Sequence, residues 1–139
     1  MNTAMLLKPK ALITYLYGDK SAADGLVELI ESGFSAVPVI NRDGYYLGVV
    51  SERDFLFCIL DDGNVDALKK DGMTVSSLAS VTRFEPVSID ADFDILFKRI
   101  VSQNFVPVID SRGMFSGIVT RQDILKFGIN KLNQYENGL

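Results

Sequence analysis

The sequence predicts a mixed α/β (α+β) fold made of two similar halves, each with the order strand, helix, strand, strand, helix. Three observations predict it. The chain of 139 residues repeats its own pattern once. Each copy alternates helix-type with strand-type hydrophobic periodicity, and each contains two short strands joined by a polar loop that ends in glycine.

The internal repeat is strongest in the second part of each copy. Residues 36–57 (AVPVINRDGYYLGVVSERDFLF) align without gaps with residues 105–126, at an offset of 69. The alignment brings a Pro-Val-Ile segment, two glycines and a final hydroxyl–carboxylate pair into register. Repetition of all these features at one offset indicates two copies of a single structural unit.

The first strand of each copy is expected within residues 11–17 and 85–89, and a helix follows near 21–32 and 91–103. Hydrophobic side chains in both helices recur at i, i+3, i+4 and i+7, the spacing of a helix with one buried face. The residues with this spacing are Ala23, Leu26, Val27 and Ile30 in the first copy and Phe93, Leu96, Phe97 and Ile100 in the second.

Two paired strands come next, at 36–40 with 45–50 and at 105–109 with 114–119. The connecting loops read NRDG and DSRG. A glycine at the end of such a loop is typical of a type I turn closed by a residue with positive φ.

The second helices start after Ser51 and Thr120 and are apolar on several faces; FLFCIL (55–60) has no polar position. One small domain cannot bury a helix on all sides. We therefore expect one face of each helix to cover its own sheet. The other faces should pack against the sister copy or in an isologous homodimer centred on residues 52–60 and 122–132.

These elements divide the chain into a first copy at 8–60, an acidic linker at 61–72 and a second copy at 73–132. A short helix capped at Thr74 is expected to begin the second copy. The tail at 133–139 has few apolar residues and is expected to fray.

Composition excludes several classes of function. The chain has no histidine, which removes the commonest general base and transition-metal ligand. Its single cysteine, Cys58, excludes an internal disulfide and a cysteine metal cage, and is expected to be a buried structural thiol. We therefore expect no metal site and no enzyme activity.

Charge and hydropathy limit the partners. A net charge of −4 provides no basic surface for a nucleic-acid backbone. The longest apolar run, 55–60, is far too short to cross a membrane, and the N-terminal segment lacks the pattern of a secretory signal. We expect a cytoplasmic protein without a membrane or nucleic-acid partner.

A hydroxyl and a carboxylate stand three residues apart at both strand-to-helix junctions, as Ser51 with Asp54 and as Thr120 with Asp123. One interpretation is a helix cap. The other is a clamp for a ligand, because an ionised carboxylate matches the two hydroxyls of a ribose and a helix N-terminus favours phosphate. Both interpretations stay open, since a capping hydroxyl can also face a cleft.

Taken together, these features resemble a tandem cystathionine-β-synthase (CBS) domain pair, or Bateman module. The resemblance covers residues from about 8 to 132 and rests on the repeated xPVI segment, the glycine before the last strand and the G-h-h-[ST]-x-x-D motif. More specifically, the chain resembles the stand-alone CBS pairs of Gram-positive bacteria. The resemblance implies two motifs packed about a pseudo-two-fold axis, in a disc-like dimer.

The resemblance also implies ligand sensing. CBS pairs bind adenosine-containing ligands such as AMP, ADP, ATP, S-adenosylmethionine or cyclic di-AMP in clefts between the motifs, and they regulate a partner protein. In the family the motif's aspartate holds the ribose hydroxyls, and residues just ahead of xPV line the pocket. No cofactor is required. The alternative is a structural or dimerisation module whose clefts are vestigial.

Carried over to this sequence, the family pattern gives two clefts. The residues expected in the first cleft are Ser35, Ala36, Pro38, Ser51, Arg53 and Asp54. The residues expected in the second are Phe105, Val106, Pro107, Thr120, Arg121 and Asp123. We expect the second cleft to be the occupied one, because the Arg121 guanidinium stands next to Thr120 and can bind a phosphate through two N–H groups.

Overall fold

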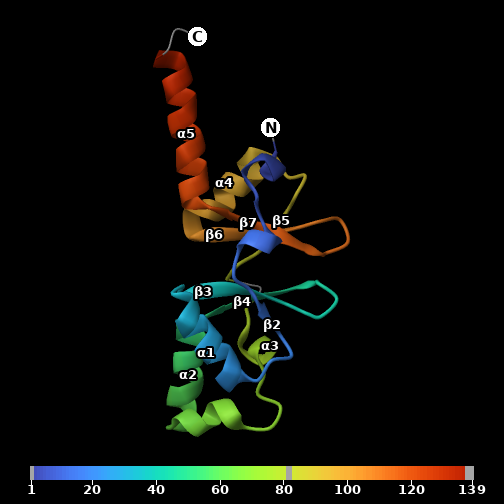
Figure 1. Ribbon diagram of the computed structural model, residues 1–139, viewed down its shortest axis with the longest axis vertical. Coiled ribbons are helices and arrows are strands. Elements are labelled where there is room, and N and C mark those ends of the chain that lie inside the picture. The colour runs from blue at the N-terminus through green and yellow to red at the C-terminus, as the bar shows by residue number, and fades with distance from the viewer. Residues whose placement is uncertain (1, 81–82, 137–139) are drawn as a thin grey trace.

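The computed structural model describes residues 2–80 and 83–136 and confirms the mixed α/β architecture of two halves. Each half has a small sheet with its two longer helices on the outer side, and the two sheets face each other at the middle of the molecule (Figure 1). The elements of the first half are β2 (Leu16–Tyr17), α1 (Ala22–Ser32), β3 (Ala36–Ile40), β4 (Tyr46–Ser51) and α2 (Glu52–Asp62). Those of the second are β5 (Val87–Ser88), α4 (Phe93–Ser102), β6 (Phe105–Ile109), β7 (Phe115–Thr120) and α5 (Arg121–Glu136).

Short elements connect and extend the two halves. They are η1 (Thr3–Leu6), β1 (Lys8–Pro9) and η2 (Lys10–Leu12) at the N-terminus, and η3 (Val65–Lys69) and α3 (Val75–Leu78) after α2. The opening strands β2 and β5 have two residues each, shorter than expected. A 3₁₀ turn takes up the start of the segment in which the first of them was predicted.

Corresponding strands in the two sheets have the same register. β2 runs parallel to β3 and β5 parallel to β6, whereas β3–β4 and β6–β7 are antiparallel hairpins. The hairpins pair Ala36 with Ser51 and Phe105 with Thr120, which are equivalent positions of the repeat. Each hairpin therefore brings the residue two positions before its proline next to the junction hydroxyl.

The two hairpin tips meet on a pseudo-two-fold axis. Tyr45 forms a bridge with Met114, its own equivalent at the offset of 69. On either side, the Phe115 N–H donates to the carbonyl oxygen of Gly44 at 2.9 Å, and the Tyr46 N–H donates to that of Gly113 at 3.3 Å. Both glycines have positive φ, at 94° and 84°, as the turn motif predicted.

The segment ahead of each half crosses to the sheet of the other half. β1 pairs with β7, and Ser80 forms a bridge with Val49 of β4. These two pairings are related by the repeat, because Val49 is the equivalent of Ile118, the residue opposite Lys8. The halves are therefore tied together by the hairpin tips and by two straps. These are the N-terminal strap, residues 2–15, and the connector ahead of β5, of which residues 79–80 and 83–86 are described.

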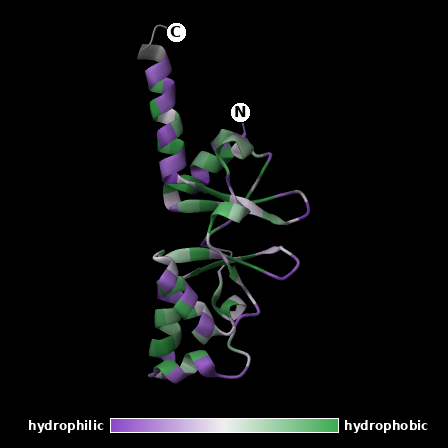
Figure 2. Cartoon of the chain, viewed as in Figure 1, coloured by the Kyte–Doolittle hydropathy of each residue, from purple (hydrophilic) through white to green (hydrophobic). Residues whose placement is uncertain are grey.

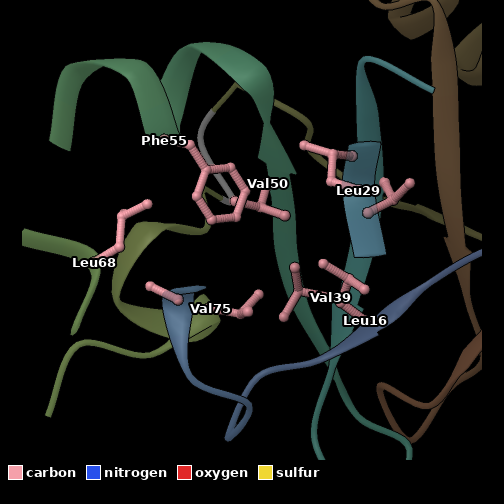
Figure 3. Close-up of a cluster of buried hydrophobic side chains, with 9 residues drawn as sticks. Leu16, Leu29, Val39, Val50, Phe55, Leu68 and Val75 are labelled. Carbon is pink, nitrogen blue, oxygen red and sulfur yellow. The ribbon is translucent and has the colours of Figure 1, made fainter. Parts of the chain in front are cut away.

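The helix predicted after Thr74 is present, and Thr74 caps it in a capping box with Ser77. Although it was predicted at the start of the second copy in the sequence, it packs against the first half in space. Val75 is fully buried there among side chains from both sheet and helices (Figure 3). The buried residues of this first core are Leu16, Ala22, Leu29, Val37, Val39, Val50, Phe55, Leu68 and Val75.

Helix α1 buries a stripe shifted from the predicted one: Ala23 and Leu26 pack against the first core as predicted, but the other two predicted residues do not. Val27 and Ile30 are 55% and 62% exposed, and the buried positions are Ala22, Gly25 and Leu29. The reason is the approach of α3, because a Cβ on Gly25 would lie 2.3 Å from the Cγ2 of Val75. Only glycine allows this contact, which decides the face that α1 presents to the core.

Helix α4 follows the prediction more closely. Leu96 and Ile100 are buried in the second core and Phe93 packs against it, while Phe97 stays 40% exposed. The buried residues of this core are Leu6, Val87, Leu96, Ile100, Val106, Val108 and Val119. Leu6 belongs to the N-terminal strap, so the second core also depends on a segment outside its own repeat.

Helices α2 and α5 both leave apolar side chains exposed. Phe55 of α2 is buried, but Leu56 and Leu60 are 53% and 61% exposed. Helix α5 extends well beyond the body of the second half, with apolar positions along it (Figures 1 and 2). It runs through Glu136, so residues 133–136 are helical where we predicted a frayed tail, and 137–139 lie outside the described residues.

Candidate functional site

A cavity of about 450 Å³ lies between the two halves. The N-terminal strap and the start of β3, with the two residues before it, form part of its wall. The connector ahead of β5 and the β6–β7 hairpin, with the residue before it, form the rest. The lining residues are Lys8, Leu12, Ile13, Thr14, Phe34, Ser35, Ala36, Val37, Pro38, Phe84, Asn104, Phe105, Ile118 and Thr120.

The cavity combines residues that we had assigned to two separate clefts. Ser35, Ala36 and Pro38, predicted to accompany Ser51 and Asp54, line the same cavity as Phe105 and Thr120. The cavity lies between facing sheets, so it receives the start of β3 from one half and the junction of β7 with α5 from the other. The structure therefore groups these five residues around one cavity, whereas the prediction divided them between two clefts.

At the second junction Thr120 and Asp123 form a reciprocal cap. The Thr120 N–H and Oγ1 both donate to Asp123 Oδ2, at 3.1 and 2.7 Å, and the Asp123 N–H donates back to Thr120 Oγ1 at 3.1 Å. The other carboxylate oxygen, Oδ1, lies 3.6 Å from the Nζ of Lys8. Thr120 and Lys8 both line the cavity, so the Asp123 carboxylate contacts two residues of the cavity wall without being part of the lining itself.

The first junction has the same geometry with a different cation. The Ser51 N–H and Oγ donate to Asp54 Oδ2 at 2.8 and 2.9 Å. Asp54 Oδ1 accepts a hydrogen bond from the guanidinium of Arg83, which comes from the connector ahead of β5. The carboxylates at both junctions therefore cap a helix with one oxygen and hold a cation with the other.

Arg121 does not take the position that we predicted for it. Its guanidinium donates to the carbonyl oxygens of Ile100 and Val101 and to Asn104 Oδ1, each at 2.9 Å. These acceptors lie at and just beyond the C-terminal end of α4, where helix carbonyls lack partners within the helix. Arg121 thus joins α5 to the end of α4 and is absent from the cavity lining.

Three further predicted residues also lie away from the cavity wall. Val106 and Pro107 are buried, and Val106 is part of the second core. Arg53 is exposed, and its guanidinium carbon lies 5.0 Å from the ring centroid of Phe57 on the outer surface of α2. The cavity wall therefore takes three consecutive residues from the start of β3 but only Phe105 from the equivalent start of β6.

Aromatic side chains provide walls that sequence reasoning missed. Phe84 and Phe105 are stacked, with ring centroids 5.3 Å apart, and Phe34 lines the same cavity. The Tyr46 hydroxyl donates to the carbonyl oxygen of Phe84 at 2.7 Å. Burial raises the pKa of Tyr46 well above its ordinary value, so this hydroxyl stays protonated and fixes the backbone at Phe84.

Some of these missed residues left a signal in the sequence. Phe34 directly precedes Ser35, so it belongs to the region ahead of xPV that the family pattern highlights. Phe84 lies outside the aligned part of the repeat, and nothing in the sequence around it marks it.

A second cavity, also of about 450 Å³, lies on the first half along α2, η3 and α3. Asp54, Phe57, Lys70 and Met73 are among its lining residues. Cys58 lines it as well and is half-buried, not fully buried as predicted. This cavity is away from the face where the two sheets meet.

Residues 2–80 and 83–136 contain neither a metal-binding cluster nor a membrane-spanning helix. In that part of the chain no three histidine, cysteine, aspartate or glutamate side chains are grouped to hold a metal ion. None of its helices has the length and apolar character needed to cross a bilayer.

A family model of the CBS domain matches residues 13–61 and 75–130. The second match begins with α3, which packs against the first half, and continues into α5. The chain belongs to the CBS-domain family. Among its relatives, a CBS domain-containing protein of Dictyostelium discoideum is 28% identical over 135 residues, covering 91% of this chain and 90% of the relative. An inosine-5′-monophosphate dehydrogenase of Nitrosopumilus maritimus is 30% identical over 106 residues, 76% of this chain. This CBS chain spans about a fifth of the length of such dehydrogenases.

Solved CBS structures match nearly the whole chain. The crystal structure of CbpB in complex with c-di-AMP has a TM-score of 0.88 at 25% identity, covering 100% of this chain and 91% of CbpB. CbpB from Streptococcus agalactiae has a TM-score of 0.85 at 26% identity, covering 96% and 84%. CBSX2 in complex with AMP shares the fold, with a TM-score of 0.75 at 21% identity over 93% and 96%.

Proposed function

We propose that this CBS pair is a regulatory module that binds an adenosine-containing ligand, such as AMP, ADP, ATP or cyclic di-AMP, in the cavity between its halves. The observation that carries the proposal is the cavity itself, about 450 Å³ in volume, with aromatic walls and the Thr120–Asp123 pair at its edge. Mostly apolar cavities of this size with a few polar groups are typical of small-molecule sites. The similar protein CbpB binds c-di-AMP.

The chemistry of the walls suggests how such a ligand would lie. The rings of Phe34, Phe84 and Phe105 offer flat apolar surfaces for a purine. Asp123 places a carboxylate behind Thr120, where ribose hydroxyls would find acceptors. The first junction differs in its cation, because the Arg83 guanidinium donates a hydrogen bond to Asp54 Oδ1, whereas the Lys8 ammonium lies 3.6 Å from Asp123 Oδ1.

A ligand in this cavity would contact both halves, which gives it a means of regulation. Binding shifts the arrangement of the halves only as far as the ligand prefers one arrangement to another. A changed arrangement would alter the surface offered to a protein target, which is not identified. We place this regulatory role in the cytoplasm, as expected from the sequence.

The exposed helix faces favour assembly as well. Apolar side chains more than 45% exposed occur on all four long helices, and we propose that they form an isologous homodimer interface. They are Val27 and Ile30 on α1, Leu56, Phe57 and Leu60 on α2, Ile95 and Val101 on α4, and Leu125, Ile129 and Leu132 on α5. The same faces support the second candidate function, a dimerisation module that binds no ligand.

A thermal-shift panel separates the two candidates. Each of AMP, ADP, ATP, S-adenosylmethionine and cyclic di-AMP is added to the purified protein at millimolar concentration. A ligand at 100 times its Kd stabilises the folded state by about 2.7 kcal/mol, which raises Tm by several degrees. No shift with any of the five would favour the ligand-free module.

The effect of Asp123→Ala on ligand affinity tests the position of the site. We expect the Kd of the ligand found in the panel to rise about tenfold or more, because a charge-assisted hydrogen bond contributes about 1.5–3 kcal/mol. Asp54→Ala is the matched control, since it removes the same cap at the other junction. A larger effect of Asp54→Ala in isothermal titration would move the site to the first junction.

A further inference from the structure

We infer that Lys8 is the residue through which the cavity recognises an anionic group, so that the site selects a phosphate-bearing nucleotide over the neutral nucleoside. This inference rests on the proposed function, because it concerns the ligand of the same cavity. Three observations support it. They are the charge of the cavity lining, the backbone pairing that fixes the N-terminal strap beside β7, and the contact of Lys8 with the same Asp123 oxygen that a ribose hydroxyl would use.

The charge of the cavity is the first observation. Of the 14 residues that line it within the described part of the chain, Lys8 alone carries a charge. The others are apolar or neutral polar side chains. A single ammonium in a largely apolar cavity attracts an anion more strongly than it would in water.

The strap is held in place by backbone contacts. Lys8 and Pro9 pair with Ile118 and Gly117 of β7, which are two and three residues before Thr120. Gly117 has a φ of 151°, and a Cβ there would lie 2.0 Å from the carbonyl oxygen of Lys8. The backbone at Lys8 is thus fixed beside the junction, while its side chain remains 43% exposed and free to change rotamer.

Competition for Asp123 links Lys8 to the ligand. Asp123 Oδ2 accepts two hydrogen bonds from Thr120, so Oδ1 is the oxygen open to a ribose hydroxyl. Lys8 Nζ lies 3.6 Å from Oδ1, a contact that is partly exposed and therefore weak. A ribose on Oδ1 would release the ammonium, and a phosphate would provide its new partner.

The neighbouring cations are engaged elsewhere. Arg121 binds acceptors at the end of α4, and Arg83 binds Asp54. The Nζ of Lys10 lies 5.3 Å from the ring centroid of Tyr15, and Lys10 does not line the cavity. Lys8 is therefore the cation placed to meet a phosphate.

Isothermal titration of AMP and adenosine into three proteins tests the inference. The proteins are the wild type, Lys8→Met, and Lys10→Met, which removes an equal charge from the same strap. We expect Lys8→Met to raise the Kd of AMP about tenfold or more, the effect of losing one charge-assisted contact. Adenosine affinity should stay within about twofold in all three proteins, and Lys10→Met should bind AMP like the wild type.

The outcomes separate the inference from the proposed function. Failure of the wild type to bind either ligand or any other adenosine compound would overturn the proposed function. Tight AMP binding by Lys8→Met, or equal loss of AMP and adenosine, would overturn the inference alone. Lys8→Arg, which keeps the charge, should retain most of the AMP affinity, and urea unfolding of each variant checks that it is folded.

Discussion

Each strand-to-helix junction uses the two oxygens of one aspartate for different tasks. In Asp54 and Asp123, Oδ2 caps the following helix and Oδ1 holds a cation. The cation is a guanidinium at Asp54 and an ammonium at Asp123. Arginine is the more rigid partner for a carboxylate, so the junction at Asp123 is the easier one for a ligand to enter.

Gly117 is the residue that allows the N-terminal strap to reach this junction. Gly117→Ala would place a Cβ 2.0 Å from the carbonyl oxygen of Lys8, on a backbone with φ of 151°. We expect a loss of about 2 kcal/mol or more in the free energy of unfolding, because the strap must move or the backbone must change. Urea denaturation followed by circular dichroism measures it.

Gly128→Ala is the matched control. Gly128 lies inside α5, and a Cβ added there would meet no atom within 4 Å beyond its own helix, so alanine gains helix propensity without a clash. It should raise stability by about 0.5–1 kcal/mol. If the two substitutions changed the free energy of unfolding equally, the contact between the N-terminal strap and β7 would contribute little to stability.

At the scale of elements, Arg121 joins the start of α5 to the end of α4. Arg121→Met removes hydrogen bonds to Ile100, Val101 and Asn104. We expect it to lower the free energy of unfolding by about 1–2 kcal/mol, a value reduced for partial exposure. AMP affinity should remain within about twofold. A large loss of affinity at unchanged stability would return Arg121 to the phosphate-binding role suggested by the sequence.

Periodicity and turn residues were enough to predict the order and approximate bounds of the main elements. They did not predict which stripe of α1 is buried, because Gly25 lets Val75 approach from a segment far along the chain. They also missed the helical continuation of α5 through Glu136, since low apolar content alone does not end a helix.

The site was predicted in parts but not as a whole. The motif identified Thr120 and Asp123, and the xPV segments identified Ser35 and Phe105, all of which lie at or beside the cavity. Their grouping depends on how two halves face each other, which no local pattern contains. The crossing of the strap that brings Lys8 to the second half is a tertiary pairing of the same kind.

At the scale of the whole molecule, the exposed helix faces predict self-association. We expect a dimer in sedimentation velocity at tens of micromolar. Leu60→Glu, which places a charge on an apolar α2 position that is 61% exposed, should shift the protein toward monomer. Val65→Glu is the matched control, because Val65 is 63% exposed on η3, away from the long helices. A monomeric wild type would contradict the dimer.

The most direct test of the central proposal is the position of a bound nucleotide. Photolabelling with 8-azido-AMP, followed by peptide mass spectrometry, reports which residues contact the base. Label is expected in the peptides that contain residues 34–38, 84 and 104–105, which line the cavity between the halves. Label confined to Phe57, Cys58 and Lys70, beside the second cavity, would contradict it.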